Sequence, residues 1–379
     1  MISTFSFPTL IHFGVGARHK VAETFKNKNL SKPLIITDKT IVKQSFFTDF
    51  VSELNKSDLN TSVFSEIFGN PVKSQVKEGV KAYLNNKSDS IIAVGGGAVL
   101  DVAKAIALMV EHEGDLFDYE DGKIDGLPVN KNIPFWVALP TTSGTGSEVG
   151  RSAVISDDET HQKKIIFSPK LLAPVVFADP ELTLNIPAHI TAATGMDALT
   201  HLVEAYLAKG YHPVCDGIAL EGIKMVSDNL VKCVKDSKDI DAKSQMMMAS
   251  MMGAIAFQKG LGVVHSCAHA LSTVSDLHHG LANGIMIDYA LKFNADFVPE
   301  RFEKMALIIG LENPSVNSFF VWLENLKKEI SIPNKLSDVN VNSDKLEKLV
   351  EVAINDGCHQ SNPKVCTRED FSKIFSEAF

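Results

Sequence analysis

The sequence predicts a protein of two domains, an α/β domain over residues 1–186 and an all-helical domain over residues 187–379. At 379 residues the chain is longer than a single hydrophobic core usually covers. Its pattern also changes once. Short runs rich in β-branched residues alternate with helical stretches up to about Pro187, and after that point only helical patterns remain.

Four short apolar runs in the first domain are expected to be strands. They cover residues 33–37, 90–94, 134–139 and 173–178. Because these runs are mainly apolar and are separated by helical stretches, they indicate a mainly parallel sheet that is covered by helices on both faces.

The second domain is expected to consist of long helices. Helical patterns cover residues 190–207, 214–233, 242–257, 298–309 and 343–354, with a loop over residues 331–343. The methionines among residues 246–252 lie in an apolar helix, so we interpret them as flexible core filling and not as a metal site.

Composition excludes several classes of function. Hydrophobic residues make up 45% and charged residues 22% of the chain, which is typical of a globular protein with a full core. A formal net charge of −9 without a basic tract argues against a nucleic-acid partner. No leader pattern or membrane-length apolar run is present, and five scattered cysteines suit a reducing compartment. We therefore expect a cytoplasmic protein with no membrane partner.

The second domain carries several possible metal ligands. Asp197 and His201 are four residues apart in an expected helix, so their side chains leave the same face one turn apart. His265 and His269 repeat this spacing, and His279 follows, preceded by His278. Imidazoles with a carboxylate suit iron(II) or zinc. The alternative is that each is an ordinary core or surface histidine, but two such pairs in an apolar stretch favour a metal.

A glycine run in the first domain is a candidate phosphate site. The expected strand at 90–94 runs into Gly95, Gly96 and Gly97, and a helix is expected to begin just after them. Such a turn offers bare backbone N–H groups and the positive end of a helix dipole to a pyrophosphate. The run differs from the G-x-G-x-x-G fingerprint, and a simple tight turn is an equal alternative.

Two further features adjoin expected strands of the first domain. Asp38 ends the first strand, where a carboxylate can bind a ribose diol and repel a 2′-phosphate; the alternative is a cap or turn residue. The hydroxyl-rich and glycine-rich loop at 140–148 follows another strand. That loop is able to wrap a ribose or phosphate, or simply to cap the next helix through Thr145 or Ser147.

Taken together, these residues resemble the iron-dependent (group III) alcohol dehydrogenase family. The resemblance rests on segments that span nearly the whole chain: residues 95–101, 140–148, 193–201 and 260–280. It implies a fold like that of dehydroquinate synthase, with an N-terminal dinucleotide-binding domain and a helical C-terminal domain that binds the metal. The family is commonly dimeric or larger, so the resemblance also implies a homo-oligomer, such as a homodimer.

The resemblance assigns roles to individual residues. It places Asp197, His201, His265 and His279 on the family's metal-ligand positions, and His269 near the nicotinamide. The implied cofactor-binding residues are Asp38, Asn70, Gly96, Gly97, Thr141, Thr142, Thr145, Lys163 and Leu182. An acid at the position of Asp38 favours NAD over NADP. The implied metal is Fe²⁺, with Zn²⁺ as the alternative.

The implied activity is hydride transfer between NAD(H) and a small primary alcohol or aldehyde. A metal beside the nicotinamide makes a bound alcohol easier to deprotonate, and His269 or His278 is expected to pass the proton to solvent. His278 has an alternative role, which is to orient a metal ligand by a hydrogen bond.

The substrate stays open between two classes. Phe257, Leu261 and Cys267 are candidate walls of an apolar pocket or helix core. If Arg151 and Lys259 bind a carboxylate, the substrate is a short ω-hydroxy acid such as 4-hydroxybutyrate; alternatively, Arg151 contacts cofactor or domain and Lys259 is solvated. Rival functional classes are a dehydroquinate synthase-like lyase, a metal-dependent hydrolase and a nucleotide-binding regulator.

Overall fold

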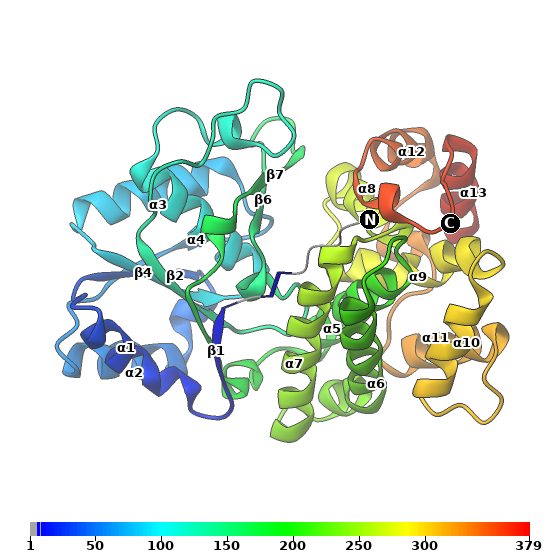
Figure 1. Ribbon diagram of the computed structural model, residues 1–379, viewed down its shortest axis with the longest axis horizontal. Helices are drawn as coiled ribbons and strands as arrows, with labels where there is room; N and C mark the ends of the chain where they lie inside the picture. The colour runs from blue at the N-terminus through cyan, green and yellow to red at the C-terminus, as the bar shows by residue number, and fades with distance from the viewer. Residues whose placement is uncertain (1–5, 8) are drawn as a thin grey trace. The chain divides into compact units, whose positions relative to one another are not determined.

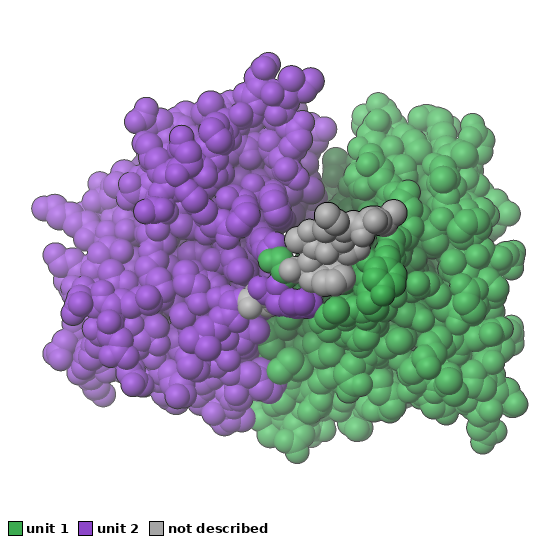
Figure 2. Space-filling model, in the orientation of Figure 1, with its two compact units in different colours: residues 1–6, 143–146, 184–379 green, residues 7–142, 147–183 purple. Residues whose placement is uncertain are grey.

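The computed structural model describes residues 6–7 and 9–379, so most of the N-terminal segment, in which no leader pattern is expected, lies outside the described residues. The chain forms two compact units, coloured separately in Figure 2. An α/β unit contains Phe7–Thr142 and Ser147–Thr183, and a helical unit contains Ser143–Gly146 and Leu184–Phe379. The main break therefore falls at residues 183/184, where the sequence suggested 186/187, and a short loop from within the first domain groups with the helices.

Six of the described strands of the α/β unit form a parallel sheet in the order β1-β8-β5-β4-β2-β3. Four of them match the expected runs to within two residues: β2 (Pro33–Asp38), β4 (Ser90–Gly95), β5 (Phe135–Pro140) and β8 (Val175–Ala178). The other two are β1 (Leu10–Phe13) and β3 (Ser62–Ile67), and a separate antiparallel hairpin joins β6 (Ser152–Ser156) to β7 (Lys163–Phe167).

Helices cover both faces of this sheet, as the apolar runs predicted. Alternate residues of β4 point to opposite faces, and Ile92 and Val94 join one core cluster with residues of two helices, α1 (Val21–Asn27) and α2 (Ser45–Lys56). The opposite side of the sheet carries α3 (Lys73–Asn85) and α4 (Gly97–Glu111), as Figure 1 shows.

The strand order reverses beside β2. From β2 the chain adds β3 on one side, and then returns to add β4 and β5 on the other. In an open α/β sheet, ligands bind outside the carboxyl ends of the strands at such a switch point. Asp38 ends β2 and Gly95 ends β4, so both flank the place where a nucleotide is expected.

The helical unit contains only helices and short turns among its described residues, which confirms the predicted fold class. Its main core cluster includes Met246 in α7, in line with core filling. No single described helix is long and apolar enough to cross a membrane, although one sharply bent pair, Ile240–Lys259 with Val263–Ser275, passes that test by length and composition. The α-helices are α5 (Ala188–Leu207), α6 (Pro213–Lys235), α7 (Ile240–Ala256), α8 (Val263–Ser275), α9 (His279–Ala295), α10 (Pro299–Ile308), α11 (Val316–Glu329), α12 (Leu346–Ile354) and α13 (Arg368–Ala378).

Candidate active site

Three helices of the helical unit bring the proposed metal ligands together. Asp197 and His201 lie one turn apart in the buried middle of α5, His265 lies in the first turn of α8, and His279 begins α9. These helices pack against one another (Figure 1). Gly280 allows the close approach of α9 to α5, because a Cβ there would lie 2.4 Å from the carbonyl oxygen of Ala193.

The ligand atoms converge on a single carboxylate oxygen. Asp197 Oδ1 lies 3.4 Å from His279 Nε2, 3.9 Å from His265 Nε2 and 4.0 Å from His201 Nε2. Metal–ligand bonds of about 2.1 Å in a tetrahedral arrangement place neighbouring ligand atoms about 3.4 Å apart. The distances, together with the borderline donor set of nitrogens and oxygen, therefore fit a divalent first-row metal.

The environment of His201 favours its neutral imidazole, which is the form that binds a metal. Burial lowers the pKa of His201 to about 4, against the opposing charge of Asp197. The ring of His201 stacks on that of His265, with 4.6 Å between centroids, and the ring of Phe257 lies 5.1 Å from His201. The cluster is thus enclosed by rings on this side.

Glu204 is a candidate functional residue that the sequence patterns did not indicate. Its carboxylate accepts a hydrogen bond of 2.6 Å from His265 Nδ1, and it also accepts bonds from the backbone N–H groups of Gly262 and Val264. This arrangement fixes the His265 tautomer with the Nε2 lone pair turned toward Asp197. The available signal was spacing, since Glu204 is three residues after His201 on the same face of α5.

The two histidines expected to move a proton have different surroundings. His269 is half-buried, and its Nδ1 donates to Asp356 Oδ2 over 2.8 Å. Burial acts to raise the pKa of Asp356, but the charge of His269 and several hydrogen bonds bring it below its usual range. The His269 ring also stacks on His279, with 5.2 Å between centroids. His278 is exposed and caps α9, where Nδ1 accepts from the N–H of Leu281.

Several proposed nucleotide-binding residues meet at the carboxyl edge of the sheet. Gly96 precedes α4, and a Cβ there would lie 3.1 Å from Thr142 Oγ1. The N–H of Thr141, which follows β5, donates to the carbonyl oxygen of Gly95. Gly97 begins α4, so bare N–H groups of a helix N-terminus lie beside two threonines, an arrangement that can hold a phosphate.

Asp38 caps a turn, which was the alternative to its expected role in binding a ribose. Its Oδ1 accepts from the N–H groups of Thr40 and Ile41, both over 2.7 Å. No hydrogen bond to Oδ2 occurs among the described residues, so one carboxylate oxygen remains available to a ribose while the other holds the turn.

The remaining proposed cofactor residues lie in different parts of the two units. Ser156 pairs with Lys163 across the hairpin and donates its N–H to the carbonyl of Pro71, the residue after Asn70. Leu182 is buried in the core cluster that includes α1 and α2. Thr145 belongs to the loop of the helical unit in which the neighbouring Gly146 abuts α7.

A buried ion pair network lies behind the nucleotide edge. Lys104 is fully buried on α4, and its Nζ donates to Ser147 Oγ over 2.7 Å and lies 3.5 Å from Asp101 Oδ1. Asp101 in turn accepts from the N–H of Val154. Burial raises the pKa of the neighbouring Glu148 to about 7. The end of the hydroxyl-rich loop is thereby fastened to α4 and β6.

The residues considered for substrate binding fall into two groups, those with buried side chains and those that are partly exposed. The side chain of Lys259 is buried and forms an ion pair with Asp216 of α6, so it is neither solvated nor directed at a substrate carboxylate. Cys267 is fully buried in the main helical core, which excludes it as a pocket wall. Phe257, Leu261 and Arg151 are partly exposed.

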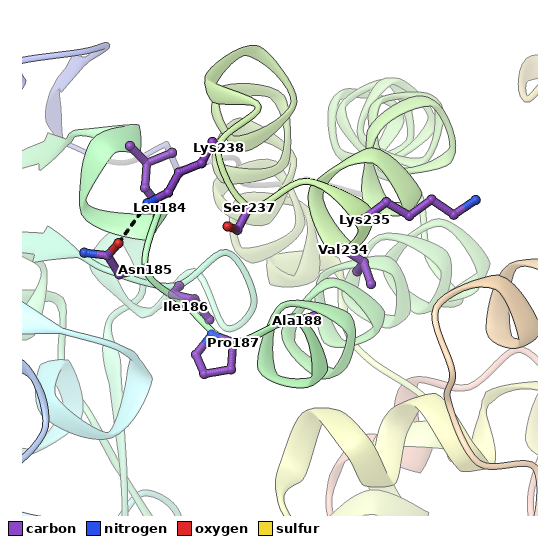
Figure 3. Close-up of a pocket in the computed structure, with 9 residues that line it drawn as sticks. All are labelled: Leu184, Asn185, Ile186, Pro187, Ala188, Val234, Lys235, Ser237 and Lys238. Carbon is purple, nitrogen blue, oxygen red and sulfur yellow. Dashed lines mark hydrogen bonds between the residues drawn. The ribbon is translucent and has the colours of Figure 1, made fainter.

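A surface pocket of about 450 Å³ lies elsewhere in the helical unit, before α5 and beside the end of α6 (Figure 3). It is lined by residues 184–188 together with Val234, Lys235, Ser237 and Lys238. Lys238 Nζ donates to Asn185 Oδ1 over 3.0 Å. The lining has no histidine or acidic side chain, so the pocket is separate in chemistry from the histidine cluster.

A parallel sheet with a glycine turn at its switch point is the usual framework for a dinucleotide. A carboxylate surrounded by imidazoles, with no cysteine thiolates, is typical of a catalytic metal and not of a structural one. Fold and cluster together are typical of a nucleotide-dependent metalloenzyme.

Comparisons with known proteins define the family. Residues 8–180 match the model of the iron-containing alcohol dehydrogenases, and residues 191–379 match that of the C-terminal domain of the Fe-containing alcohol dehydrogenase family. The chain is 34% identical to 4-hydroxybutyrate dehydrogenase of Cupriavidus necator, over 98% of each chain, and 34% identical to NAD-dependent methanol dehydrogenase of Bacillus methanolicus, over 100% of each. Among solved structures, it is similar to an alcohol dehydrogenase from Oenococcus oeni, with a TM-score of 0.95 and 32% identity over 100% of both chains.

The chain therefore belongs to the iron-containing alcohol dehydrogenase family. This confirms the resemblance inferred from the motifs, and with it the expected class of enzyme, an NAD-dependent oxidoreductase that acts on CH–OH groups.

Proposed function

We propose that Asp197, His201, His265 and His279 bind the catalytic metal, with Fe²⁺ preferred over Zn²⁺. The observation that carries this proposal is the convergence of three Nε2 atoms on Asp197 Oδ1, at 3.4 to 4.0 Å. When bound, such a metal supplies a Lewis acid that polarises the oxygen of an alcohol or aldehyde. The family's name supports iron, although the donor set also accepts zinc.

The nucleotide proposal assigns the cofactor to the α/β unit. Gly96, Gly97, Thr141 and Thr142 are proposed to bind the pyrophosphate, because the glycines present N–H groups at the start of α4 and the two threonines follow β5, with Thr142 beside Gly96. Asp38 is proposed to bind the adenosine ribose through Oδ2 and thus to favour NAD over NADP. Asn70, Thr145, Lys163 and Leu182 are proposed as cofactor contacts on the family resemblance alone.

His269 is the better candidate for proton transfer. Asp356 holds its Nδ1, so Nε2 is the nitrogen left to accept or release a proton. His278 uses Nδ1 to cap α9 and is exposed, which leaves it the role of a relay to solvent. Both assignments are tested by replacing each histidine with glutamine and measuring the rate against pH.

The proposed substrate is a small primary alcohol or the corresponding aldehyde. The alternative is a short ω-hydroxy acid, and the similarity to a 4-hydroxybutyrate dehydrogenase supports it. Against it, Lys259 already forms an ion pair with Asp216, which leaves only Arg151 of the two expected carboxylate partners.

Comparing kcat/KM for 4-hydroxybutyrate and 1-butanol tests this choice. A strong preference for 1-butanol supports the plain alcohol. A preference for the hydroxy acid that disappears in Arg151→Ala supports the alternative instead.

We further propose that the enzyme is cytoplasmic and forms a homodimer or larger homo-oligomer, without nucleic-acid or membrane partners. Charge, cysteine content and family resemblance support these proposals. Sedimentation of the purified protein tests the oligomer, and a monomer at micromolar concentration would refute it.

A further inference from the structure

A buried amide reaches the metal-ligand cluster from α9. Asn283 lies one turn after His279, is fully buried, and donates from Nδ2 to Asp197 Oδ1 over 2.8 Å. The same nitrogen lies 3.2 Å from His279 Nε2 and 3.5 Å from His265 Nε2. One side chain thus contacts ligand atoms from all three helices that build the cluster.

The oxygen of this amide lowers the stability of the folded protein. Asn283 Oδ1 is buried and has no hydrogen-bond partner among the described residues. An unsatisfied buried acceptor lowers stability, and such a group calls for an explanation. An apolar residue of the same size would avoid that cost, so the Nδ2 contacts are what distinguish asparagine at this position.

The contact with Asp197 is the one that matters for geometry. Asn283 is the only hydrogen-bond donor to the Asp197 carboxylate among the described residues. Without that donor, no hydrogen bond from the described residues would fix the rotation of the carboxylate about its Cβ–Cγ bond. His265 is oriented by Glu204 in a comparable way, so each of these two ligands has a partner of its own.

We propose that Asn283 is a positioning residue for the metal centre, which aims the Asp197 carboxylate at the ion. The proposal rests on the proposed function, since it assumes that Asp197 and the histidines bind metal. Partners of this kind contribute roughly 10- to 100-fold to metal affinity. Asn283 therefore acts through Asp197 and is not assigned a contact with substrate.

The test measures metal binding and not turnover. Metal-free protein is titrated with Zn²⁺ against a chromogenic chelator, for the wild type, for Asn283→Leu, which keeps the branched shape but removes the donor, and for Asn283→Ala, which cannot overpack. We expect the dissociation constant for Zn²⁺ to rise roughly 10- to 100-fold in both variants. Added Zn²⁺ should also raise the unfolding temperature of each variant less than that of the wild type.

Asn294→Leu is the matched control. Asn294 is also buried on α9, and its amide pairs with Asn362 and not with the ligand cluster. This variant should lose stability while keeping the affinity of the wild type for Zn²⁺. An equal loss of affinity in Asn294→Leu would reduce Asn283 to a structural role and overturn the proposal.

Asp197→Ala distinguishes failure of the proposed metal site from failure of the proposed role of Asn283. If Asp197→Ala binds Zn²⁺ as the wild type does, the proposed metal site itself is wrong. If Asp197→Ala loses the metal but both Asn283 variants bind it as tightly as the wild type, or more tightly, then only the positioning role is refuted.

Discussion

The two units build their binding sites from different parts of the chain. In the α/β unit, the candidate nucleotide site consists largely of backbone, with bare N–H groups after β4 and small side chains beside them. In the helical unit, the candidate metal site consists of side chains that extend from α5, α8 and α9 into a buried space. The backbone site requires that the glycines carry no side chain, because a Cβ would fill the space for the ligand. The side-chain site requires the ligand atoms of the aspartate and the histidines.

This contrast predicts opposite sensitivities. The metal site should be broken by removing atoms, and the nucleotide site by adding them. Each of the following substitutions tests one side of the comparison, beginning with the largest expected effect on turnover.

Removing a ligand should have the largest effect. Asp197→Ala and His265→Ala should each lose bound metal and lower kcat/KM by roughly a thousandfold, because several kcal/mol of charge stabilisation disappear. NAD binding should persist, since these residues lie in the helical unit. Metal analysis and titration with NADH check both expectations, and a variant that retains both metal and turnover would refute the ligand assignment.

Adding atoms at the glycine turn should have the next largest effect. In Gly96→Val the new side chain meets Thr142, whose Oγ1 would lie 3.1 Å from the Cβ. Overpacking of about 1–3 kcal/mol should weaken NADH binding roughly tenfold or more and leave the metal content unchanged. Gly217→Ala is the control, because a Cβ there meets nothing within 4 Å. Unchanged NADH affinity in Gly96→Val would remove the turn from the cofactor site.

Two substitutions of Asp38 should distinguish its role as a cap from its role in the choice between NAD and NADP. Asp38→Asn keeps an acceptor for the N–H groups of Thr40 and Ile41 but loses the negative charge, so it should shift preference toward NADP roughly tenfold with little loss of stability. Asp38→Gly should show the same shift and also lose about 1 kcal/mol of stability. If neither variant changes the ratio of kcat/KM for the two nucleotides, Asp38 is only a cap.

Glu148 should affect stability and hardly affect turnover. Burial raises its pKa from 4.5 to about 7, so the folded protein binds more protons than the unfolded chain between these values. The contribution of this group to stability is therefore full below pH 4.5 and is lost as the pH rises toward 7. Glu148→Gln should remove that decline in denaturant unfolding between pH 5 and 8, and an identical slope in both proteins would contradict the prediction.

The sequence predicted most of the fold because its strands and helices carry strong local patterns. Residues 91–94 are all apolar and became most of β4, while the i, i+4 spacing placed Asp197 and His201 on one face of α5. The hairpin of β6 and β7 was missed, since both strands contain polar residues at their ends and they pair with each other outside the main sheet.

The parts of the site that were missed depend on contacts between distant segments. Asn283 meets Asp197 because α9 approaches α5 closely at Gly280, and nothing local to Asn283 shows this. Lys259 appeared solvated or directed at a substrate until Asp216 of α6 was placed beside it. Glu204 could have been predicted from the sequence, since it lies one helical turn after His201.

The most direct measurement is an anaerobic assay of purified protein, loaded with Fe²⁺ and supplied with NAD and a panel of small primary alcohols. The expected result is an increase in the absorbance of reduced nicotinamide that depends on the alcohol, and that is lost on chelation and in Asp197→Ala. If no alcohol or aldehyde in the panel supports turnover with Fe²⁺ or Zn²⁺, or if turnover is unchanged after the metal is removed, the proposed metal-assisted hydride transfer is wrong.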